Sequence, residues 1–315
     1  MNVVCIIQAR VSSNRLPGKV LMKILDTPIL EHIVNFLKFS KSIDKIVIAT
    51  SDENNDNSVC DLAESIGIDF FRGSLHDVLK RYYDCATKFN ADLIVRITAD
   101  NPLIDPELVD NVINTCKKFE CDYASNMIQQ SFPSGYLVEV LTYSTLQNLY
   151  HTQHDLDSRE HVTPHIRKNP NLFTTKQIFA PKNMDRPNWR LTLDYQEDLD
   201  FFNAVLVEYK NMGNTDSCSI CLQDIIDIIE KKPEIKDINF SRQLDWKENQ
   251  EKNNKLNLKN STKFLGNELK YMKDIILNSK KLSCTTGSWT NSLEKFFAKK
   301  MGCRYGIAFN SGTST

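Results

Sequence analysis

The sequence predicts an α/β protein with a doubly wound, mostly parallel β-sheet and helices on both faces. Short apolar segments typical of strands alternate with segments of helical apolar spacing over residues 1–126, a pattern typical of parallel sheets. The first apolar run, residues 3–7, is typical of a buried strand. After residue 133, strand patterns follow one another without long crossovers, which predicts an antiparallel addition to one side of the sheet.

The expected elements follow one another along residues 1–240. Strands are predicted at residues 3–7, 45–51, 69–72, 92–100, 136–142, 173–179 and 190–194. Helices are predicted at residues 29–37, 59–66, 78–86, 106–119, 197–209 and 220–229. The helix at 106–119 follows Asp105, a residue type that caps a helix by accepting hydrogen bonds from its first amide groups.

Composition limits the classes of partner. The 315 residues are 41% hydrophobic and 25% charged, which is typical of a globular protein with a buried core. The formal net charge is −1, so nucleic acid and anionic membranes are not expected as partners, and phosphate binding must depend on local basic clusters. No apolar run approaches the length of a membrane span and the N-terminus lacks the zones of a signal peptide, so a cytoplasmic location is expected.

The nine cysteines are an odd number scattered along predicted strands and helices, which favours reduced thiols over a disulfide framework. Cys218 and Cys221 form an isolated C-x-x-C at the start of an apolar helix. Without a second pair or nearby histidines, they are interpreted as small buried residues rather than as a zinc or redox site.

The loop Q-A-R-V-S-S-N-R-L-P-G-K, residues 8–19, joins the first strand to the first helix and contains the cations Arg10, Arg15 and Lys19. Open α/β sheets bind ligands at the carboxyl ends of their strands, and a cationic turn before a helix is suited to phosphate groups. The loop matches neither the P-loop nor the dinucleotide-binding glycine pattern, which disfavours a dinucleotide-dependent oxidoreductase. It therefore predicts an anion site, the alternative being a solvated surface turn.

Two aspartates end predicted strands, Asp100 in T-A-D-N-P and Asp194 in R-L-T-L-D. Each also has an ordinary structural explanation, because Asp100 could form an Asx-turn and Asp194 could cap the next helix with Glu197 completing a capping box. Taken together and facing a cationic loop, they are suited to Mg²⁺, which binds one or two carboxylates and completes its shell with phosphate and water. The metal would neutralise phosphate charge while a hydroxyl attacks phosphorus.

The same loop, read as I-I-Q-A-R-V-S-S-N-R-L-P-G-K, resembles the signature of cytidylyltransferases that make nucleotide-activated sugars, the group that includes CMP-sugar synthetases. The nearest branch resembles the spore-coat polysaccharide biosynthesis cytidylyltransferases. Further matching blocks follow in order: R-I-T-A-D-N-P-L-I-D at 96–105, P-S-G-Y-L-V-E-V at 133–140, S-R-E-H-V-T-P-H-I at 158–166 and R-L-T-L-D-Y-Q-E-D-L at 190–199. The resemblance covers residues 1–240 and implies a nucleotidyltransferase domain with a nucleotide-diphospho-sugar transferase-like Rossmann fold.

The resemblance implies Mg²⁺-dependent attack of a sugar hydroxyl on the α-phosphate of CTP, with release of pyrophosphate, in the synthesis of a polysaccharide or glycan precursor. The catalytic residues that it implies are Lys19, Arg15, Asp100 and Asp194, with Mg²⁺ held by the two aspartates. The substrate-binding residues that it implies are Gln8, Arg10, Ser12, Gly135, Glu139, Arg159, Glu160 and His161, the last five on the sugar side. It also implies a homodimer.

Two residues of the sugar side leave alternatives open. His161 could bind the sugar, act as a base or be a structural histidine. Glu139 lies within the predicted strand L-V-E-V with apolar neighbours, so it needs a partner, either a sugar hydroxyl or an arginine. The nucleotide is also open, because GTP or UTP would require the same chemistry. A non-catalytic nucleotide-binding module is the alternative from another class.

A polar linker is expected at residues 241–262 because charged and amide side chains dominate there. Residues 263–315, with F-L-G-N-E-L-K-Y-M, T-G-S-W-T-N-S-L-E-K-F-F-A and Y-G-I-A-F-N-S-G-T-S, resemble the N-terminal part of pyridoxal-phosphate (PLP) sugar aminotransferases. The resemblance implies a PLP-phosphate loop at Ser311, Gly312 and Thr313. Because no Schiff-base lysine region follows, PLP is expected only in a longer bifunctional protein, of which this chain would be a fragment.

Overall fold

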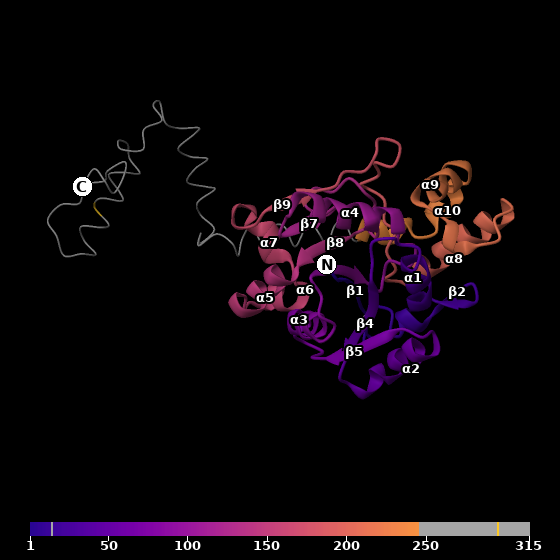
Figure 1. Cartoon of the computed structure of the whole chain (residues 1–315). Helices are drawn as coiled ribbons and strands as arrows, with labels where there is room; N and C mark the ends of the chain where they lie inside the picture. The colour runs from indigo at the N-terminus through magenta and orange to yellow at the C-terminus, as the bar shows by residue number, and fades with distance from the viewer. Residues whose placement is uncertain (14, 246–294, 296–315) are drawn as a thin grey trace, which may run out of the picture. The chain divides into compact units, whose positions relative to one another are not determined.

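A seven-stranded β-sheet in the order β5-β4-β1-β6-β8-β7-β9 forms the centre of the structure (Figure 1). The parallel part consists of β1 (Val3–Gln8), β4 (Lys45–Ser51), β5 (Asp69–Gly73) and β6 (Leu93–Thr98). The short strand β8 (Glu139–Thr142) runs antiparallel to both β6 and β7 (Tyr123–Ser125), and β7 runs parallel to β9 (Thr175–Gln177). The predicted parallel sheet with an antiparallel addition is therefore confirmed.

The computed structural model describes residues 1–13, 15–245 and 295, and residues 1–245 form one compact unit. The expected linker beyond residue 245 and the aminotransferase-like segment at 263–315, with Ser311, Gly312 and Thr313, lie outside the described residues apart from Lys295. In the described part of the chain, no helix is long and apolar enough to cross a membrane.

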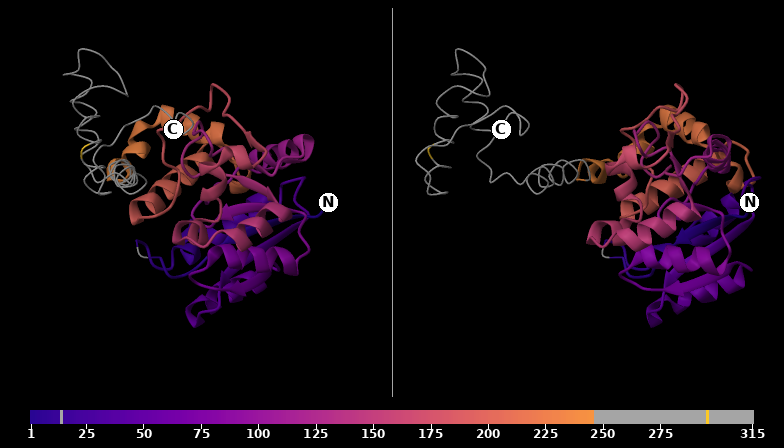
Figure 2. Two further views of the ribbon diagram at one scale, coloured as in Figure 1. Left: turned by 90° about the vertical axis from the view of Figure 1, so that its left-hand side faces the viewer. Right: turned by 60° about the vertical axis from the view of Figure 1, so that its left-hand side comes forward.

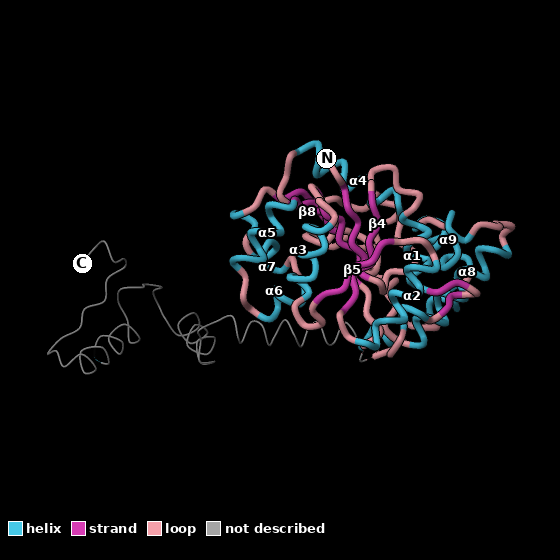
Figure 3. The backbone as a smooth tube through the Cα atoms, turned by 60° about the horizontal axis from the view of Figure 1, so that its bottom comes forward, coloured by secondary structure: helices cyan, strands magenta, loops and turns pink. Residues whose placement is uncertain are grey.

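Helices cover both faces of the sheet because the side chains of β1 alternate between two cores. Val3, Cys5 and Ile7 face a core shared with α1 (Ile29–Leu37), α2 (Asn57–Ser65), α4 (Pro106–Phe119), α8 (Gln196–Asn211) and α9 (Leu222–Lys231). Val4 and Ile6 face a second core shared with α3 (Val78–Lys88), α5 (Tyr143–Thr152) and α7 (Pro164–Lys168). Figure 3 shows the strands between these two groups of helices, and Figure 2 gives further views.

The remaining elements are short. They are the strands β2 (Lys23–Ile24) and β3 (Thr27–Pro28), the helices α6 (Leu156–His161) and α10 (Pro233–Asp237), and the 3₁₀ turns η1 (Lys19–Leu21), η2 (Asn54–Asp56), η3 (Pro170–Leu172) and η4 (Ser217–Ser219). Asp105 caps α4 as predicted, since its carboxylate accepts hydrogen bonds from the amides of Glu107 and Leu108 at 2.8 and 3.3 Å.

The predicted strand at 190–194 is wrong, because its backbone groups bond to loops instead of to a sheet. Leu191 N donates to Ser134 O at 2.6 Å, and Leu193 N donates to Asp100 O at 2.8 Å. The start of the linker also needs correction. Residues 241–245 are helical, Gln243 is buried, and Arg242 pairs with Glu197 at 2.8 Å, so this part packs on the folded unit.

Gly135 allows the segment at 190–194 to lie against the loop after β7. Its φ is +107°, and a Cβ atom at this position would lie 1.9 Å from Leu191 O. Gly135 is therefore a close-packing position for the backbone, and its expected contact with a sugar stays a prediction.

Replacing Gly135 by alanine is expected to destabilise the fold by about 3 kcal/mol, because the Cβ meets backbone atoms that cannot move aside. Denaturant titration measures the change. Gly67→Ala is the matched control: Gly67 also has a positive φ, +68°, but nothing lies within 4 Å of its Cβ position. A cost of about 1 kcal/mol is expected there. Equal destabilisation by Gly135→Ala and Gly67→Ala would contradict the close approach of the Leu191 backbone to residue 135.

Glu139 lies opposite Arg96 in the β6–β8 pairing and is only 1% exposed. Its carboxylate pairs with Arg96 Nη1 at 2.5 Å and with Arg167 Nη1 at 3.1 Å. The hydroxyls of Tyr123 and Thr163 donate to Glu139 Oε1 at 2.6 and 2.5 Å. Burial raises the pKa of Glu139, but the two arginines and the two hydroxyls outweigh burial and hold the pKa below its ordinary value. Of the two partners expected for Glu139, the structure contains the arginine.

Glu139→Gln is expected to destabilise the protein by about 3 kcal/mol at neutral pH, because it leaves buried arginine charges without a carboxylate. The pKa of Glu139 is lower in the folded state, so its contribution is present above the unfolded pKa and is lost as the pH falls through the folded pKa. Urea titrations should therefore show the difference between wild type and variant shrinking in acid.

The matched control is Glu230→Gln. Glu230 pairs with Arg186 at 3.0 Å, but its side chain is 58% exposed. A change of about 0.5 kcal/mol or less is expected, as for surface ion pairs. A destabilisation by Glu139→Gln as small as that by Glu230→Gln would show that the buried ion pairs of Glu139 do not stabilise the fold.

Candidate active site

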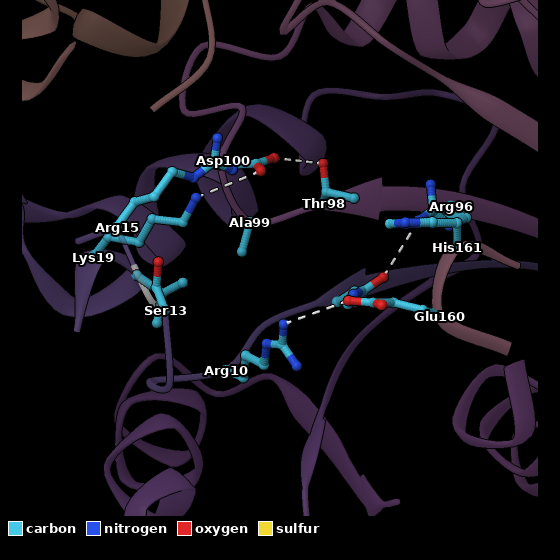
Figure 4. A pocket seen from close by; sticks show the side chains of 12 residues that line it. Arg10, Ser13, Arg15, Lys19, Arg96, Thr98, Ala99, Asp100, Glu160 and His161 are labelled. Atoms are coloured by element: carbon cyan, nitrogen blue, oxygen red, sulfur yellow. Dashed lines mark hydrogen bonds and ion pairs between the residues drawn. The ribbon is translucent and has the colours of Figure 1, made fainter. Parts of the chain in front are cut away.

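A cavity of about 320 Å³ opens at the carboxyl ends of β1 and β6 (Figure 4). Its lining consists of Gln8, Arg10, Ser13, Arg15, Lys19, Val20, Arg96, Thr98, Ala99, Asp100, Glu160 and His161. Seven of the twelve residues expected in the nucleotidyltransferase site therefore line one cavity, and Asp194 is not among them.

The cationic loop is held at both ends by backbone hydrogen bonds. Val11 N donates to Asp56 Oδ1 at 2.7 Å, and the Asp56 carboxylate is buried. Gly18 N donates to Val11 O at 2.9 Å, which closes the loop, and Gly18 adopts a φ of +73°. This turn places Lys19 at the start of η1, with its side chain 11% exposed in the cavity wall.

The Lys19 ammonium group joins Asp100 and Asp194. Its Nζ lies 3.0 Å from Asp194 Oδ1 and 3.5 Å from Asp100 Oδ2, and it also donates to Leu193 O at 2.7 Å. Figure 4 shows the side chains of Lys19 and Asp100 next to each other, with a dashed line marking their ion pair. Two carboxylates from distant parts of the chain thus meet at one positive charge.

Backbone contacts explain why these aspartates are neighbours. The Asp100 carbonyl accepts hydrogen bonds from Leu193 N at 2.8 Å and from the Thr192 hydroxyl at 3.2 Å. At the start of α8, Asp198 Oδ2 accepts from the amides of Asp194 and Tyr195 at 2.8 and 2.9 Å. Asp198, and not Asp194 with Glu197, therefore caps this turn. The capping alternative is wrong, and the Asp194 carboxylate is left to the cations.

The Asp194 carboxylate is nearly buried and surrounded by positive charge. Arg15 Nη2 lies 2.9 Å from Oδ1, and Arg190 Nη2 lies 2.9 Å from Oδ2. Burial raises the pKa of Asp194, but Lys19, Arg15 and Arg190 outweigh burial and hold the pKa below its ordinary range. Asp194 is therefore an anion at neutral pH, as a metal ligand needs to be.

The other end of the cavity is lined from α6 and β6. Glu160 Oε1 lies 4.0 Å from Arg10 Nη2, so α6 faces the cationic loop across the opening. His161 lies at the rim, where its side chain is 58% exposed and 4.0 Å from Asp157 Oδ1. Arg96 reaches the lining from within β6 while its Nη1 remains paired with Glu139.

Three of the expected substrate-binding residues do not line the cavity, in addition to Gly135. Ser12 lies in the loop with its side chain exposed, and its neighbour Ser13 lines the cavity instead. Glu139 is buried behind Arg96. Arg159 pairs with Asp77 Oδ2 at 3.1 Å and donates to Tyr150 O at 3.0 Å. In the free protein its guanidinium group thus connects α6 to α5 and to the residue before α3.

Sequence reasoning missed Arg96, Thr98 and Arg190. Arg96 could have been found, because an arginine inside the apolar run L-I-V-R-I-T needs a buried partner, and so does Glu139. Arg190 begins the quoted block R-L-T-L-D-Y-Q-E-D and pairs with Asp194 and Asp198 four and eight residues later. Nothing in the local sequence indicates that the Thr98 hydroxyl reaches Asp100.

The described residues contain no group of three or more His, Cys, Asp or Glu side chains arranged for a metal ion. Cys218 and Cys221 are free thiols, and Cys221 lies at the N-cap of α9. The pair of Asp100 and Asp194 remains, and two carboxylates are enough for Mg²⁺ when a substrate supplies further oxygens.

Comparison with known proteins identifies the family of the chain. A family model described as cytidylyltransferase matches residues 4–235. The protein MJ1063 of Methanocaldococcus jannaschii is 38% identical over 252 residues, which cover 80% of this chain and 100% of that protein. Spore coat polysaccharide biosynthesis protein SpsF of Bacillus subtilis is 32% identical over 238 residues, covering 74% of this chain and 96% of SpsF.

A solved structure of a cytidylyltransferase from Leptospira borgpetersenii is also similar. It superposes with a TM-score of 0.69 at 33% identity, covering 75% of this chain and 96% of that chain. The family match, the relatives and the sheet topology agree over the same residues. The chain therefore belongs to the cytidylyltransferase family and is an enzyme of the nucleotidyltransferase class.

Proposed function

We propose that this protein couples CTP to a hydroxyl group of a sugar and releases pyrophosphate, in the synthesis of a polysaccharide or glycan precursor. The observation that carries the proposal is the Lys19 ammonium group held between Asp100 and Asp194 beside a cationic loop. Family membership supports cytidine as the base, and the similarity to SpsF supports a sugar product for a polysaccharide. Residues 1–245 would form the nucleotidyltransferase domain.

The residues present fit a Mg²⁺ ion. Asp100 and Asp194 each direct one carboxylate oxygen at Lys19 Nζ, so both oxygens can contact a single cation. Both would hold the ion together with phosphate oxygens and water. When bound, Mg²⁺ supplies positive charge that neutralises phosphate oxygens.

The cationic loop would orient the triphosphate. Arg10 and Arg15 have side chains that are 38% and 50% exposed and line the cavity, so their guanidinium groups are accessible to phosphate oxygens. Lys19 would transfer its contacts from the carboxylates to phosphate when the nucleotide binds. Fixed positive groups around the reacting phosphorus stabilise the charge of the transition state without further reorganisation.

The acceptor sugar would bind at the end formed by α6 and β6. Glu160 and His161 can hydrogen-bond hydroxyl groups there, and Arg96 offers a guanidinium group from the cavity wall. These groups would hold one hydroxyl in line with the α-phosphate, and positioning of this kind accounts for much of phosphoryl-transfer catalysis.

The test is release of pyrophosphate by the full chain with CTP, UTP or GTP and a panel of acidic and amino sugars, with and without Mg²⁺. Turnover is expected with CTP, Mg²⁺ and at least one sugar. Asp100→Asn should reduce turnover by about a hundredfold or more, because it removes a charged metal ligand. Asp69→Asn is the control, since Asp69 only pairs with Lys45 at the surface and should leave turnover unchanged.

Each alternative has its own outcome in this assay. Turnover with GTP or UTP in place of CTP would assign another base. Binding of CTP by dialysis without turnover on any sugar would support a non-catalytic nucleotide-binding module. No binding of any nucleotide would overturn the proposed function.

A further inference from the structure

Each of the two aspartates has one oxygen engaged by Thr98 or Arg190 and the other directed at Lys19, and the half-exposed Arg15 also places Nη2 2.9 Å from the Lys19-facing oxygen of Asp194. Asp100 Oδ1 accepts the Thr98 hydroxyl at 2.6 Å, while Oδ2 lies 3.5 Å from Lys19 Nζ. Asp194 Oδ2 accepts from Arg190 Nη2 at 2.9 Å, while Oδ1 lies 3.0 Å from Lys19 Nζ. The two carboxylates therefore offer one oxygen each to whatever cation lies between them.

The donor to Asp100 is itself fixed. Asn101 Nδ2 donates to Thr98 Oγ1 at 3.1 Å, so the Thr98 hydroxyl accepts from Asn101 and directs its own hydrogen at Asp100. Asn101 is 4% exposed and has little freedom to turn away. The Thr98 hydroxyl is thus held in the orientation that engages Asp100 Oδ1.

The donor to Asp194 is fixed more strongly. The Arg190 side chain is 1% exposed, and its Nη1 pairs with the buried Asp198. Asp198 also accepts from the Asp194 amide at 2.8 Å and from Asn239 Nδ2 at 3.0 Å. Movement of Arg190 away from Asp194 Oδ2 would also take the positive charge away from the buried Asp198 carboxylate, which is costly.

Divalent cations differ in how they use carboxylates. Mg²⁺ takes six oxygens in near-ideal octahedral geometry, whereas Ca²⁺ takes six to eight and often binds a carboxylate through both of its oxygens. Resting on the proposed function, we propose that Thr98 and Arg190 are positioning residues that restrict Asp100 and Asp194 to one oxygen each. The site thereby favours Mg²⁺ or Mn²⁺ over Ca²⁺.

The test measures Mn²⁺ retained by the full chain in equilibrium dialysis at saturating CTP, without sugar, and the concentrations of Mg²⁺ and Ca²⁺ that displace it. For the wild type, displacing Mn²⁺ should require a higher concentration of Ca²⁺ than of Mg²⁺. In Thr98→Val, Asp100 Oδ1 loses its hydrogen-bond donor and becomes available to the metal ion. The ratio of the Ca²⁺ concentration to the Mg²⁺ concentration that displaces Mn²⁺ should therefore fall by about tenfold, a size typical of changes next to metal ligands. The metal preference of CTP itself is the same for every variant and cancels.

Thr98→Ser keeps the hydroxyl and is the matched control, with the wild-type ratio expected. Arg190→Lys is a second variant, which keeps the positive charge but loses the second N–H donor group of the guanidinium. Thermal unfolding establishes that each variant is folded. An unchanged ratio in Thr98→Val, complete loss of Mn²⁺ from it, or no preference for Mg²⁺ in wild type would overturn the inference. Failure of wild type to retain Mn²⁺ with CTP would instead overturn the proposed metal-bound triphosphate.

Discussion

The structure of the site depends on one electrostatic constraint, which is that Asp100 and Asp194 lie close enough to share the Lys19 ammonium group. Two carboxylates this close repel each other unless a cation lies between them. Lys19 supplies this charge in the free protein, while Arg15 and Arg190 stabilise Asp194 from other sides. A bound metal ion with a triphosphate can satisfy the same requirement, which is why an arrangement that stabilises the free protein also suits nucleotide chemistry.

Most of the surrounding fold holds these three groups in place. β1 delivers Lys19 through a loop anchored on Asp56, and β6 delivers Asp100. Asp194 comes from a segment without strand pairing, which can approach only because residue 135 has no side chain. The buried pair of Arg96 and Glu139 applies the same principle at the end of the cavity formed by α6 and β6, where the carboxylate holds an arginine that lines the cavity.

The sequence was sufficient to predict the sheet and the cationic loop, and to place Asp100 directly after a strand, because apolar periodicity is a local property. It was not sufficient for Gly135, Glu139 and Arg159, whose roles depend on partners distant in the chain. Gly135 meets Leu191, Glu139 pairs with Arg96 and Arg159 pairs with Asp77. A motif identifies such residues without telling whether their side chains face a ligand or the protein interior. The segment at 190–194 has the apolar alternation of a strand, yet its hydrogen bonds go to loops.

The most direct test of this account is the position of the metal. Crystals of the full chain grown with Mn²⁺ and a non-hydrolysable CTP analogue would locate the ion by anomalous scattering. A peak is expected between Asp100 Oδ2 and Asp194 Oδ1, with Lys19 Nζ moved from the carboxylates to a phosphate oxygen. A peak away from both aspartates, or Lys19 still paired with them while the nucleotide lies elsewhere, would contradict it.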